Sequence, residues 1–485
     1  MSGVHKLAHF FAHPTPAGLA ILAGLLILLP AIAYLGLRLA PGLLVCVGLG
    51  LEIFSGNWRY MHVPLPLDRL MLLAGLLSLI LGGRRAMADR AFVLRPVHVL
   101  LLVVAAWATM SAIGAGTLAG HNGFYALLDR LGLVPFLGFT LAPLLFGDAR
   151  RRNMLIVTMV VVGGYLSVTA IMEGTGLLRY VEPSYIRNPH LGIHYGRSRG
   201  PFLEAEADGL AMVMCAVAAS IGVTTWKGRK ARVAAAGVVL TCAVGAIFTL
   251  TRSIWIGGAL ALIVGVVAHP RTRRWSPLFV LGAAALAVSV VFAVPSLHTK
   301  ARDRLESASP VWDRENTDLA ALRAAEAHPL LGIGWETFQT KGPSYLREGN
   351  YPLTGAGLEV HNVLLSHAAE LGLPGAILWL LALLAAVGGA VFRRSRPEML
   401  PWRVGLLCIA VPFLVVANVS PLSYPFPNFV LWLWAGVTAT PYLSRPFLPR
   451  RLPSGWGHPE DVPVDPVEQI PAEHLVEFAS EQLHR

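Results

Sequence analysis

Charged residues are scarce in this chain. Asp, Glu, Lys and Arg make up 14% of its 485 residues, whereas a soluble domain carries about 25%. Hydrophobic residues make up 55%, and the mean hydropathy is positive at +0.60. This composition argues against an ordinary soluble enzyme. It predicts a protein that crosses a membrane several times.

Cysteine is also scarce, and the common catalytic motifs are missing. The four cysteines lie inside apolar stretches without metal-ligand spacing, which argues against a disulfide framework and a zinc site. They are Cys46, Cys215, Cys242 and Cys408. The chain has no Walker motif, no HExxH and no GxSxG. A nucleotide-binding loop, a zinc protease and a serine hydrolase are therefore not indicated.

The long apolar stretches predict an all-α polytopic bundle of about 12 or 13 membrane-spanning helices. The candidates are 17–39, 41–55, 68–82, 97–113, 131–146, 154–172, 208–225, 231–249, 253–268, 277–294, 374–392, 403–419 and 427–443. The first is too long for a signal-peptide core, so we expect it to be retained. If 17–55 crosses twice, the N-terminus faces outward with 13 spans; otherwise it faces inward with 12.

Basic residues occupy every second connection between these spans, which explains the net charge of +11 without nucleic acid as a partner. The basic groups are Arg84/Arg85/Arg90, Arg150/Arg151/Arg152, Lys227/Arg229/Lys230/Arg232, Arg271/Arg273/Arg274 and Arg393/Arg394/Arg396. Lys and Arg favour cytoplasmic loops, so all five can be cytoplasmic together. The other connections then face outward: 114–130, 173–207, 250–252, 295–362 and 420–426.

The domain organisation follows from this layout. Residues 1–449 form one membrane domain, and the Pro-rich, acidic tail 450–485 is expected to be cytoplasmic and largely disordered. The outward loop 295–362 is expected to be partly helical, with a helix over 313–327 that Pro329 ends. We find no internal repeat.

Three arginines lie in outward-facing positions. Arg197 and Arg199 precede a span, and Arg252 lies in a very tight turn between two spans. Guanidinium groups match phosphate oxygens in charge and geometry, and an ionisable residue at membrane depth indicates function by default. The alternatives are arginines that reach for the phosphates of membrane lipids, or that cap helix carbonyls.

Two further outward groups could carry chemistry. His361, followed by Asn362, can be neutral near pH 7 and accept a proton, or it can simply start a helix. We interpret 361–371 as a helix at the outer face before the next crossing. The carboxylates Glu204, Glu206 and Asp208 could bind a divalent cation, act as a base, or balance the nearby arginines.

These groups, in this order, resemble the O-antigen ligase family and related polysaccharide polymerases. The resemblance rests on four motifs across about 195–380: Arg199-Gly200-Pro201-Phe202 entering a helix, the turn Thr251-Arg252-Ser253, the run His328-Pro329-Leu330-Leu331-Gly332-Ile333-Gly334, and His361-Asn362 followed by Glu370-Leu371-Gly372-Leu373-Pro374-Gly375. The chain departs from the family where an Asn-Pro-Asn-like run is common, because it has Glu204, Glu206 and Asp208 instead. A carboxylate therefore remains open as the base.

The resemblance implies a membrane glycosyltransferase of the GT-C type. Its donor would be a glycan on undecaprenyl pyrophosphate, its acceptor a glycan, lipid or protein, and its active site would face outward from the cytoplasmic membrane. Carried over, Arg199 and Arg252 would bind the pyrophosphate and His361 would be catalytic, with Arg197, Asn362 and Glu370 as possible additions. No cofactor or metal is implied.

The same resemblance covers a ligase, a repeat-unit polymerase and a protein O-glycosyltransferase, which differ in the acceptor. A transporter or flippase of lipid-linked sugars is the alternative from another class. It would need polar residues along a path through the membrane and often shows repeat symmetry. Charged residues are sparse in the middle of these helices, and the long outward loop favours chemistry at one face.

Overall fold

The computed structural model describes residues 40–63, 65–86, 90–268, 270, 272–293, 299, 302, 309–347, 359–393 and 396–446. The candidate span 17–39 and the tail 450–485 lie outside these residues. By its contacts the chain divides into two units, Met1–Pro446 and Phe447–Arg485. The described helices and strands all belong to the first unit.

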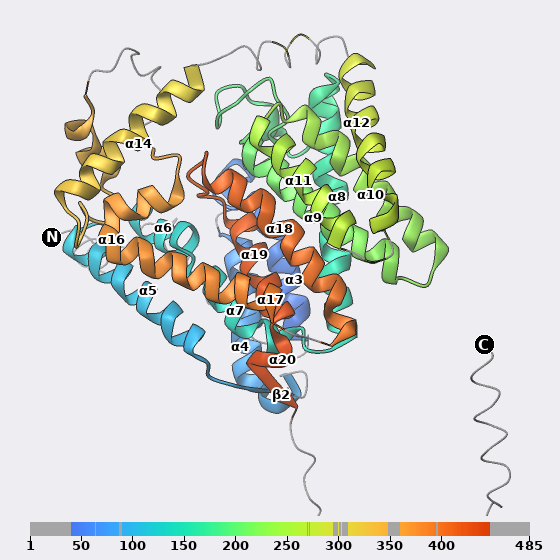
Figure 1. The fold of residues 1–485 in the computed structure, drawn as a ribbon, viewed down its shortest axis with the longest axis horizontal. Coiled ribbons are helices and arrows are strands. Elements are labelled where there is room, and N and C mark those ends of the chain that lie inside the picture. The colour runs from blue at the N-terminus through green and yellow to red at the C-terminus, as the bar shows by residue number, and fades with distance from the viewer. Residues whose placement is uncertain are drawn as a thin grey trace, which may run out of the picture. The chain divides into compact units, whose positions relative to one another are not determined.

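The first unit is almost entirely helical, in agreement with the all-α prediction (Figure 1). Its α-helices are α3 (Pro41–Leu51), α4 (Leu67–Ala86), α5 (Pro96–Gly114), α6 (His121–Ala126), α7 (Leu133–Leu145), α8 (Ala149–Gly174), α9 (Ala205–Thr225), α10 (Arg229–Phe248), α11 (Arg252–Ala268), α12 (Ser276–Ala293), α14 (Ser309–Ala327), α15 (Phe338–Lys341), α16 (Val363–Leu383), α17 (Gly389–Phe392), α18 (Leu400–Ala417), α19 (Pro425–Thr438) and α20 (Thr440–Leu443).

Short 3-10 and π helices join these elements. They are η1 (Glu52–Phe54), η2 (Trp58–Met61), η3 (Leu127–Leu131), η4 (Leu178–Tyr180), η5 (Ser184–Arg187), η6 (Gly200–Phe202), η7 (Arg273–Trp275), η8 (Gly342–Tyr345), η9 (Leu384–Gly388) and η10 (Pro397–Met399). In the described chain, one antiparallel pair forms between β1 (Arg90–Phe92) and β2 (Ser444–Pro446), with Ala91 opposite Arg445.

Among the residues that the structure describes, eight helical segments are long and apolar enough to cross a membrane. They are Pro96–Gly114, Asn122–Leu145, Ala149–Gly174, Ala205–Thr225, Arg229–Phe248, Arg273–Ala293, Val363–Phe392 and Pro397–Ala417. Pro41–Phe54 and Arg252–Ala268 are shorter apolar helices. A multi-pass membrane protein is therefore confirmed, while the total of about 12 or 13 spans stays a prediction.

The helix α19 forms the centre of the core. From Phe426 to Thr438 every residue is buried, which is typical of a helix that is surrounded by others. It packs against α7, α9 and α18, and Trp434 of α19 donates a hydrogen bond to the Trp402 carbonyl of α18 at 3.1 Å.

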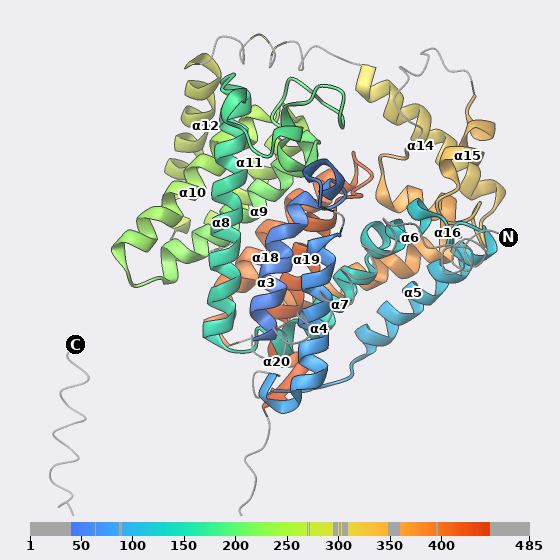
Figure 2. The same ribbon diagram turned by 180° about the vertical axis from the view of Figure 1, so that it is seen from behind.

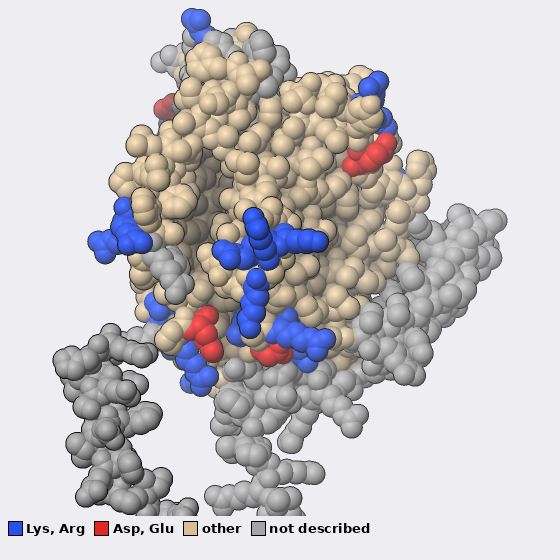
Figure 3. Space-filling model, turned by 90° about the vertical axis from the view of Figure 1, so that its right-hand side faces the viewer, with Lys and Arg blue, Asp and Glu red and all other residues tan. Residues whose placement is uncertain are grey.

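At the edge of the bundle, α10 and α12 turn apolar side chains outward. No residue of α12 is buried, although the helix is strongly apolar, so it suits lipid surroundings rather than water. Figure 3 shows this side of the molecule, where large areas carry no charge and Lys and Arg gather mainly in the middle and lower part. The connection between α9 and α10 contributes exposed Lys227, Arg229, Lys230 and Arg232.

Helix α14 lies alongside α16, as both ribbon views show (Figure 1, Figure 2). The expected helix over 313–327 is confirmed, and it begins earlier, at Ser309. Its buried alanines Ala320, Ala321 and Ala324 face Val360 and Ala369 in one small core. Small side chains let the two helices approach closely, so α14 holds the start of α16 in place.

Candidate active site

The segment 197–204 enters α9 in a conformation that several contacts fix. The Pro201 carbonyl accepts hydrogen bonds from Asn57 Nδ2 at 2.9 Å and from the Tyr185 hydroxyl at 2.8 Å. Gly200 has a φ of 52°, and a Cβ there would lie 2.3 Å from Asp208 Oδ1. Only glycine fits this close approach, which gives the Arg-Gly-Pro-Phe motif a structural reason.

Arg199 is buried, with 1% of its surface exposed, and its guanidinium contacts a nearby loop. Nη2 donates to the carbonyls of Ile186 at 3.0 Å and Asn188 at 2.7 Å, and Nη1 donates to the Leu191 carbonyl. The Tyr195 ring lies 4.9 Å from its guanidinium carbon. These contacts favour a role in holding the loop 186–193, whereas a contact with pyrophosphate stays a prediction.

The other two arginines belong to adjacent backbone segments. Ser198 N donates to the Phe248 carbonyl at 3.1 Å, which joins the Arg197 segment to the turn before Arg252. Arg197 and Arg252 are both half-buried. Arg252 is the first residue of α11, where the positive end of the helix dipole adds to its charge. An anion is the ligand that this charge distribution favours.

The three acidic residues next along the chain do not form one cluster. Glu204 accepts a hydrogen bond from the Tyr424 hydroxyl, Glu206 pairs with Arg314 at 3.3 Å, and Asp208 is fully buried beneath Gly200. Within the described residues, no three His, Cys, Asp or Glu side chains are arranged to hold a metal ion. Burial raises the pKa of Glu204 to about 8.

His361 lies between α14 and the start of α16. Asp318 of α14 accepts hydrogen bonds from the backbone N–H groups of His361 and Asn362. The Asn362 side chain caps α16 by accepting from Leu365 N at 3.0 Å, and it donates to Asn418 Oδ1 at 3.2 Å. Asn362 therefore starts the helix, which leaves the His361 imidazole for another role.

The His361 side chain is half-buried and hydrogen-bonds the Glu359 backbone, while its buried Nδ1 has no hydrogen-bond partner among the residues that the structure describes. Burial lowers its pKa, and the positive charge of Arg314 lowers it further. The imidazole is therefore mostly neutral at pH 7. A neutral imidazole with an unoccupied nitrogen can accept a proton.

The two glycine-containing motifs, 328–334 and 370–375, are joined by backbone hydrogen bonds. Ile333 N donates to the Ala369 carbonyl at 2.8 Å, Gly334 N to the Glu370 carbonyl at 3.1 Å, and Leu373 N to the Pro329 carbonyl at 2.8 Å. These bonds replace helical bonds that the break at Gly372 and the missing N–H of Pro374 remove. The helix expected over 361–371 is present as the first part of α16, from Val363 to the kink at Gly372.

Residues 236–380 match a family model described as O-antigen ligase. This segment is therefore similar to the O-antigen ligase family, in agreement with the resemblance of the sequence motifs. The matched segment includes Arg252, His361 and Glu370, whereas Arg199 and the three acidic residues precede it. No curated protein matches the chain. The match supports, in general terms, glycan transfer by a membrane glycosyltransferase-like enzyme with a lipid-linked glycan and an acceptor as partners.

Glu370 of the matched segment has a structural partner that the sequence did not reveal. Arg130 of η3 pairs with Glu370 and with Glu336, and it donates to Ser366 Oγ at 3.1 Å. The ring of Trp335 lies 4.7 Å from its guanidinium carbon. Arg130 therefore connects the loop that carries Glu336 to α16 near its kink. Glu370 holds α16 in place through this ion pair instead of facing the half-buried His361.

Sequence reasoning missed four residues of this site: Arg130, Arg314, Asp318 and Tyr424. Arg314 and Asp318 are on the polar side of a helix that we expected, one turn apart. Their pairing with Glu206 and His361 joins segments more than 40 residues apart along the chain, and no local spacing indicates it. Tyr424 lies in the short connection 420–426, which carries no recognisable motif.

Proposed function

We propose that this protein transfers a glycan from an undecaprenyl-pyrophosphate donor to an acceptor at the outer face of the cytoplasmic membrane. The observation that carries the proposal is the setting of His361. Its backbone is held by Asp318, its Nδ1 has no partner among the described residues, and burial with the charge of Arg314 keeps it neutral near pH 7. These are the properties of a general base.

In the proposed reaction, His361 accepts the proton of an acceptor hydroxyl while that oxygen forms a bond to the anomeric carbon of the donor. The bond between this carbon and the pyrophosphate oxygen breaks, and the pyrophosphate leaves on its lipid. Attack from the opposite side inverts the anomeric centre. Charge stabilisation of the leaving group supplies a large part of the rate enhancement, and holding the two substrates together supplies more.

The proposal gives the arginines different tasks. Arg252, at the start of α11, neutralises the leaving pyrophosphate, and Arg197 on the adjacent segment assists. Arg199 acts as a positioning residue because its guanidinium is engaged by the carbonyls of loop 186–193. The donor contact that the family resemblance implies for Arg199 is then indirect.

Glu204 is the less suitable base. With a pKa of about 8 it is mostly protonated at pH 7, and it already accepts a hydrogen bond from Tyr424. Glu206 is engaged by Arg314. A reaction without a metal ion fits a site in which arginines neutralise the leaving group, and unchanged transfer in the presence of a chelator is the test of this part.

The outer-face orientation rests on the basic connections, which favour the cytoplasm. The side that carries His361 then faces outward, and the tail 450–485 faces inward. A ligase and a repeat-unit polymerase share this chemistry and differ in the acceptor, so the polymerase remains the second candidate within the family.

The decisive experiment is glycan profiling of a deletion strain that is complemented with wild type, His361→Ala or His190→Ala. His190 is exposed in the outward segment 173–207 and serves as the matched control. We expect wild type and His190→Ala to restore transfer, and His361→Ala to leave the finished glycan on undecaprenyl pyrophosphate. Single repeat units in the deletion strain would indicate a polymerase, and full complementation by His361→Ala would contradict the assigned base.

A further inference from the structure

Two arginines at the ends of two spans lie against one tyrosine ring. Arg95 directly precedes the span Pro96–Gly114, and Arg393 directly follows the span Val363–Phe392. Their guanidinium carbons lie 4.4 Å and 3.5 Å from the centre of the Tyr442 ring. Within the described part of the chain, no carboxylate forms an ion pair with either arginine. Two neighbouring cations without an anion favour binding of one.

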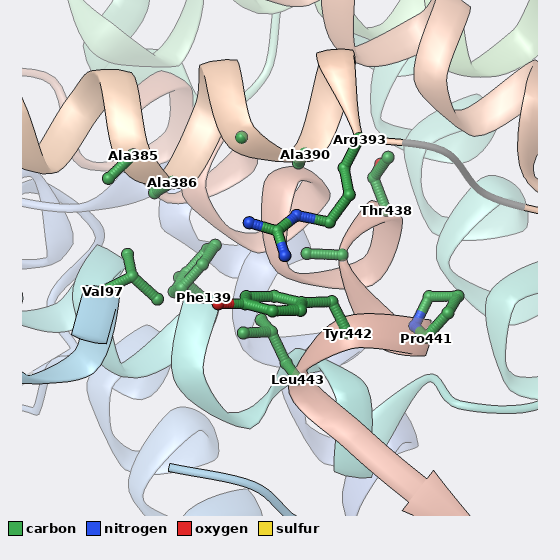
Figure 4. A pocket seen from close by; sticks show the side chains of 12 residues that line it. Val97, Phe139, Ala385, Ala386, Ala390, Arg393, Thr438, Pro441, Tyr442 and Leu443 are labelled. Carbon is green, nitrogen blue, oxygen red and sulfur yellow. The ribbon is translucent and has the colours of Figure 1, made fainter. Parts of the chain in front are cut away.

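Arg393 and Tyr442 line a cavity of about 220 Å³, which we call the arginine pocket. Its remaining walls are mostly small or apolar, and they include Val97, Phe139 and Gly389. Figure 4 shows the Arg393 side chain extending over the Tyr442 ring into this space. A charged group on one side and apolar walls on the other match an amphiphile better than a free ion.

A second hollow begins at Arg95 and runs along α5. This α5 groove of about 590 Å³ is lined by Leu94, Arg95, Pro96, Val99, Leu100, Val103 and Leu378. Val99 and Val103 are 51% and 42% exposed and lie within a span, so in the membrane they would contact lipid chains. The groove therefore continues from a cation at the span end toward the apolar interior of the membrane.

We propose that the arginine pocket and the α5 groove bind one anionic glycerophospholipid. Its phosphate contacts Arg393 and Arg95, one acyl chain follows the α5 groove, and the other enters the arginine pocket. Basic pockets between spans are suited to anionic headgroups, because lipid phosphates lie at the depth where the spans end. The site lies at the end of the span Val363–Phe392 opposite to His361, so it is separate from the proposed glycan chemistry.

Two variants remove different halves of this site. Arg393→Gln removes the charge, and the matched control Arg396→Gln removes an exposed charge from the same connection. Gly389→Leu fills the arginine pocket, since a Cβ at Gly389 meets nothing within 4 Å. Its control is Gly388→Leu. A Cβ at Gly388 also meets nothing within 4 Å, but Gly388 does not line the pocket.

The test is native mass spectrometry of the purified full chain, titrated with phosphatidylglycerol, phosphatidylcholine or inorganic phosphate. We expect tighter binding of phosphatidylglycerol than of phosphatidylcholine, a loss of about fivefold or more in Arg393→Gln and in Gly389→Leu, and no change in either control. Equal binding by all variants would overturn the proposal. So would displacement by inorganic phosphate alone, or a clear preference for a polyprenyl phosphate. If Arg393→Gln fails to fold, Gly389→Leu against Gly388→Leu decides.

Discussion

Arg314 Nη2 on α14 lies 3.3 Å from Glu206 Oε1 in the first turn of α9. This ion pair connects α14, which lies beside His361, with the segment that follows Arg199. It also controls the charge near the imidazole, since Arg314 lowers the pKa of His361. The pair is partly exposed, so its effect on stability is small. Its effect on the protonation of His361 is the part that experiments can detect.

Arg314→Gln should raise the pKa of His361, because the cation that disfavours the imidazolium is removed. The proposed base must be neutral, so transfer falls as the pH drops through its pKa. The acid limb of the pH–rate profile should therefore move to higher pH, by up to about one unit. Arg314→Lys keeps the charge and is the control, which should leave the limb in place.

Glu206→Gln should act in the opposite direction. It removes the anion that partly neutralises Arg314, so the pKa of His361 falls and the acid limb moves to lower pH. Both profiles can be measured with purified protein and a lipid-linked donor. If the acid limb of the pH–rate profile moved in the same direction in Arg314→Gln and Glu206→Gln, the limb would not reflect the protonation of His361.

Arg199 and Arg252 should respond differently to substitution. Arg199→Ala removes four hydrogen bonds to the carbonyls of loop 186–193, so it should lower the unfolding temperature by several degrees and expose this loop to proteolysis. Arg252→Ala should abolish transfer with a near-normal unfolding temperature, and Arg252→Lys should restore little because bidentate contact is lost. If Arg199→Ala kept loop 186–193 intact and had normal stability, Arg199 would instead be assigned to binding of the donor pyrophosphate.

The kink in α16 should be intolerant of a side chain at Gly372. Gly372 has a φ of 75°, and a Cβ there would lie 2.4 Å from the Leu330 carbonyl oxygen. Gly372→Ala combines backbone strain with a clash against backbone, so we expect a loss of at least about 2 kcal/mol in the free energy of unfolding. The control is Gly237→Ala in α10, where a Cβ meets nothing within 4 Å. Similar unfolding temperatures for the two variants would contradict the pairing of the glycine motifs.

The sequence predicted the helices well because apolar length decides what can span a membrane. It predicted α14 from the spacing of Leu319 and Leu322 and from Pro329, which are local signals. It also predicted a helix over 361–371 before the next span, because the stretch is too polar and too short to cross a membrane, but it did not predict the contacts of those polar residues. Their polarity is explained by Arg130, which pairs with Glu370 from 240 residues away. Partners of this kind depend on tertiary packing and leave no local pattern.

Glu204→Gln separates the two candidate bases. In the folded protein, burial keeps Glu204 protonated up to a pKa of about 8, whereas an unfolded chain loses this proton above about pH 4.3. The folded state therefore binds more protons between these values, so Glu204 makes stability fall as pH rises through that window. The glutamine variant removes this dependence and can still accept the Tyr424 hydrogen bond. Its unfolding temperature should match wild type near pH 4 and exceed it increasingly toward pH 9.

The control for this measurement is Glu326→Gln, an exposed glutamate on α14. Transfer by Glu204→Gln should stay within about tenfold of wild type at pH 7, because losing a catalytic base costs at least about 100-fold. If transfer is abolished while the gain in unfolding temperature over wild type grows with pH as expected, the buried carboxyl of Glu204 is confirmed and is itself essential. The base would then be Glu204, and His361 would be a neighbour that orients the acceptor hydroxyl.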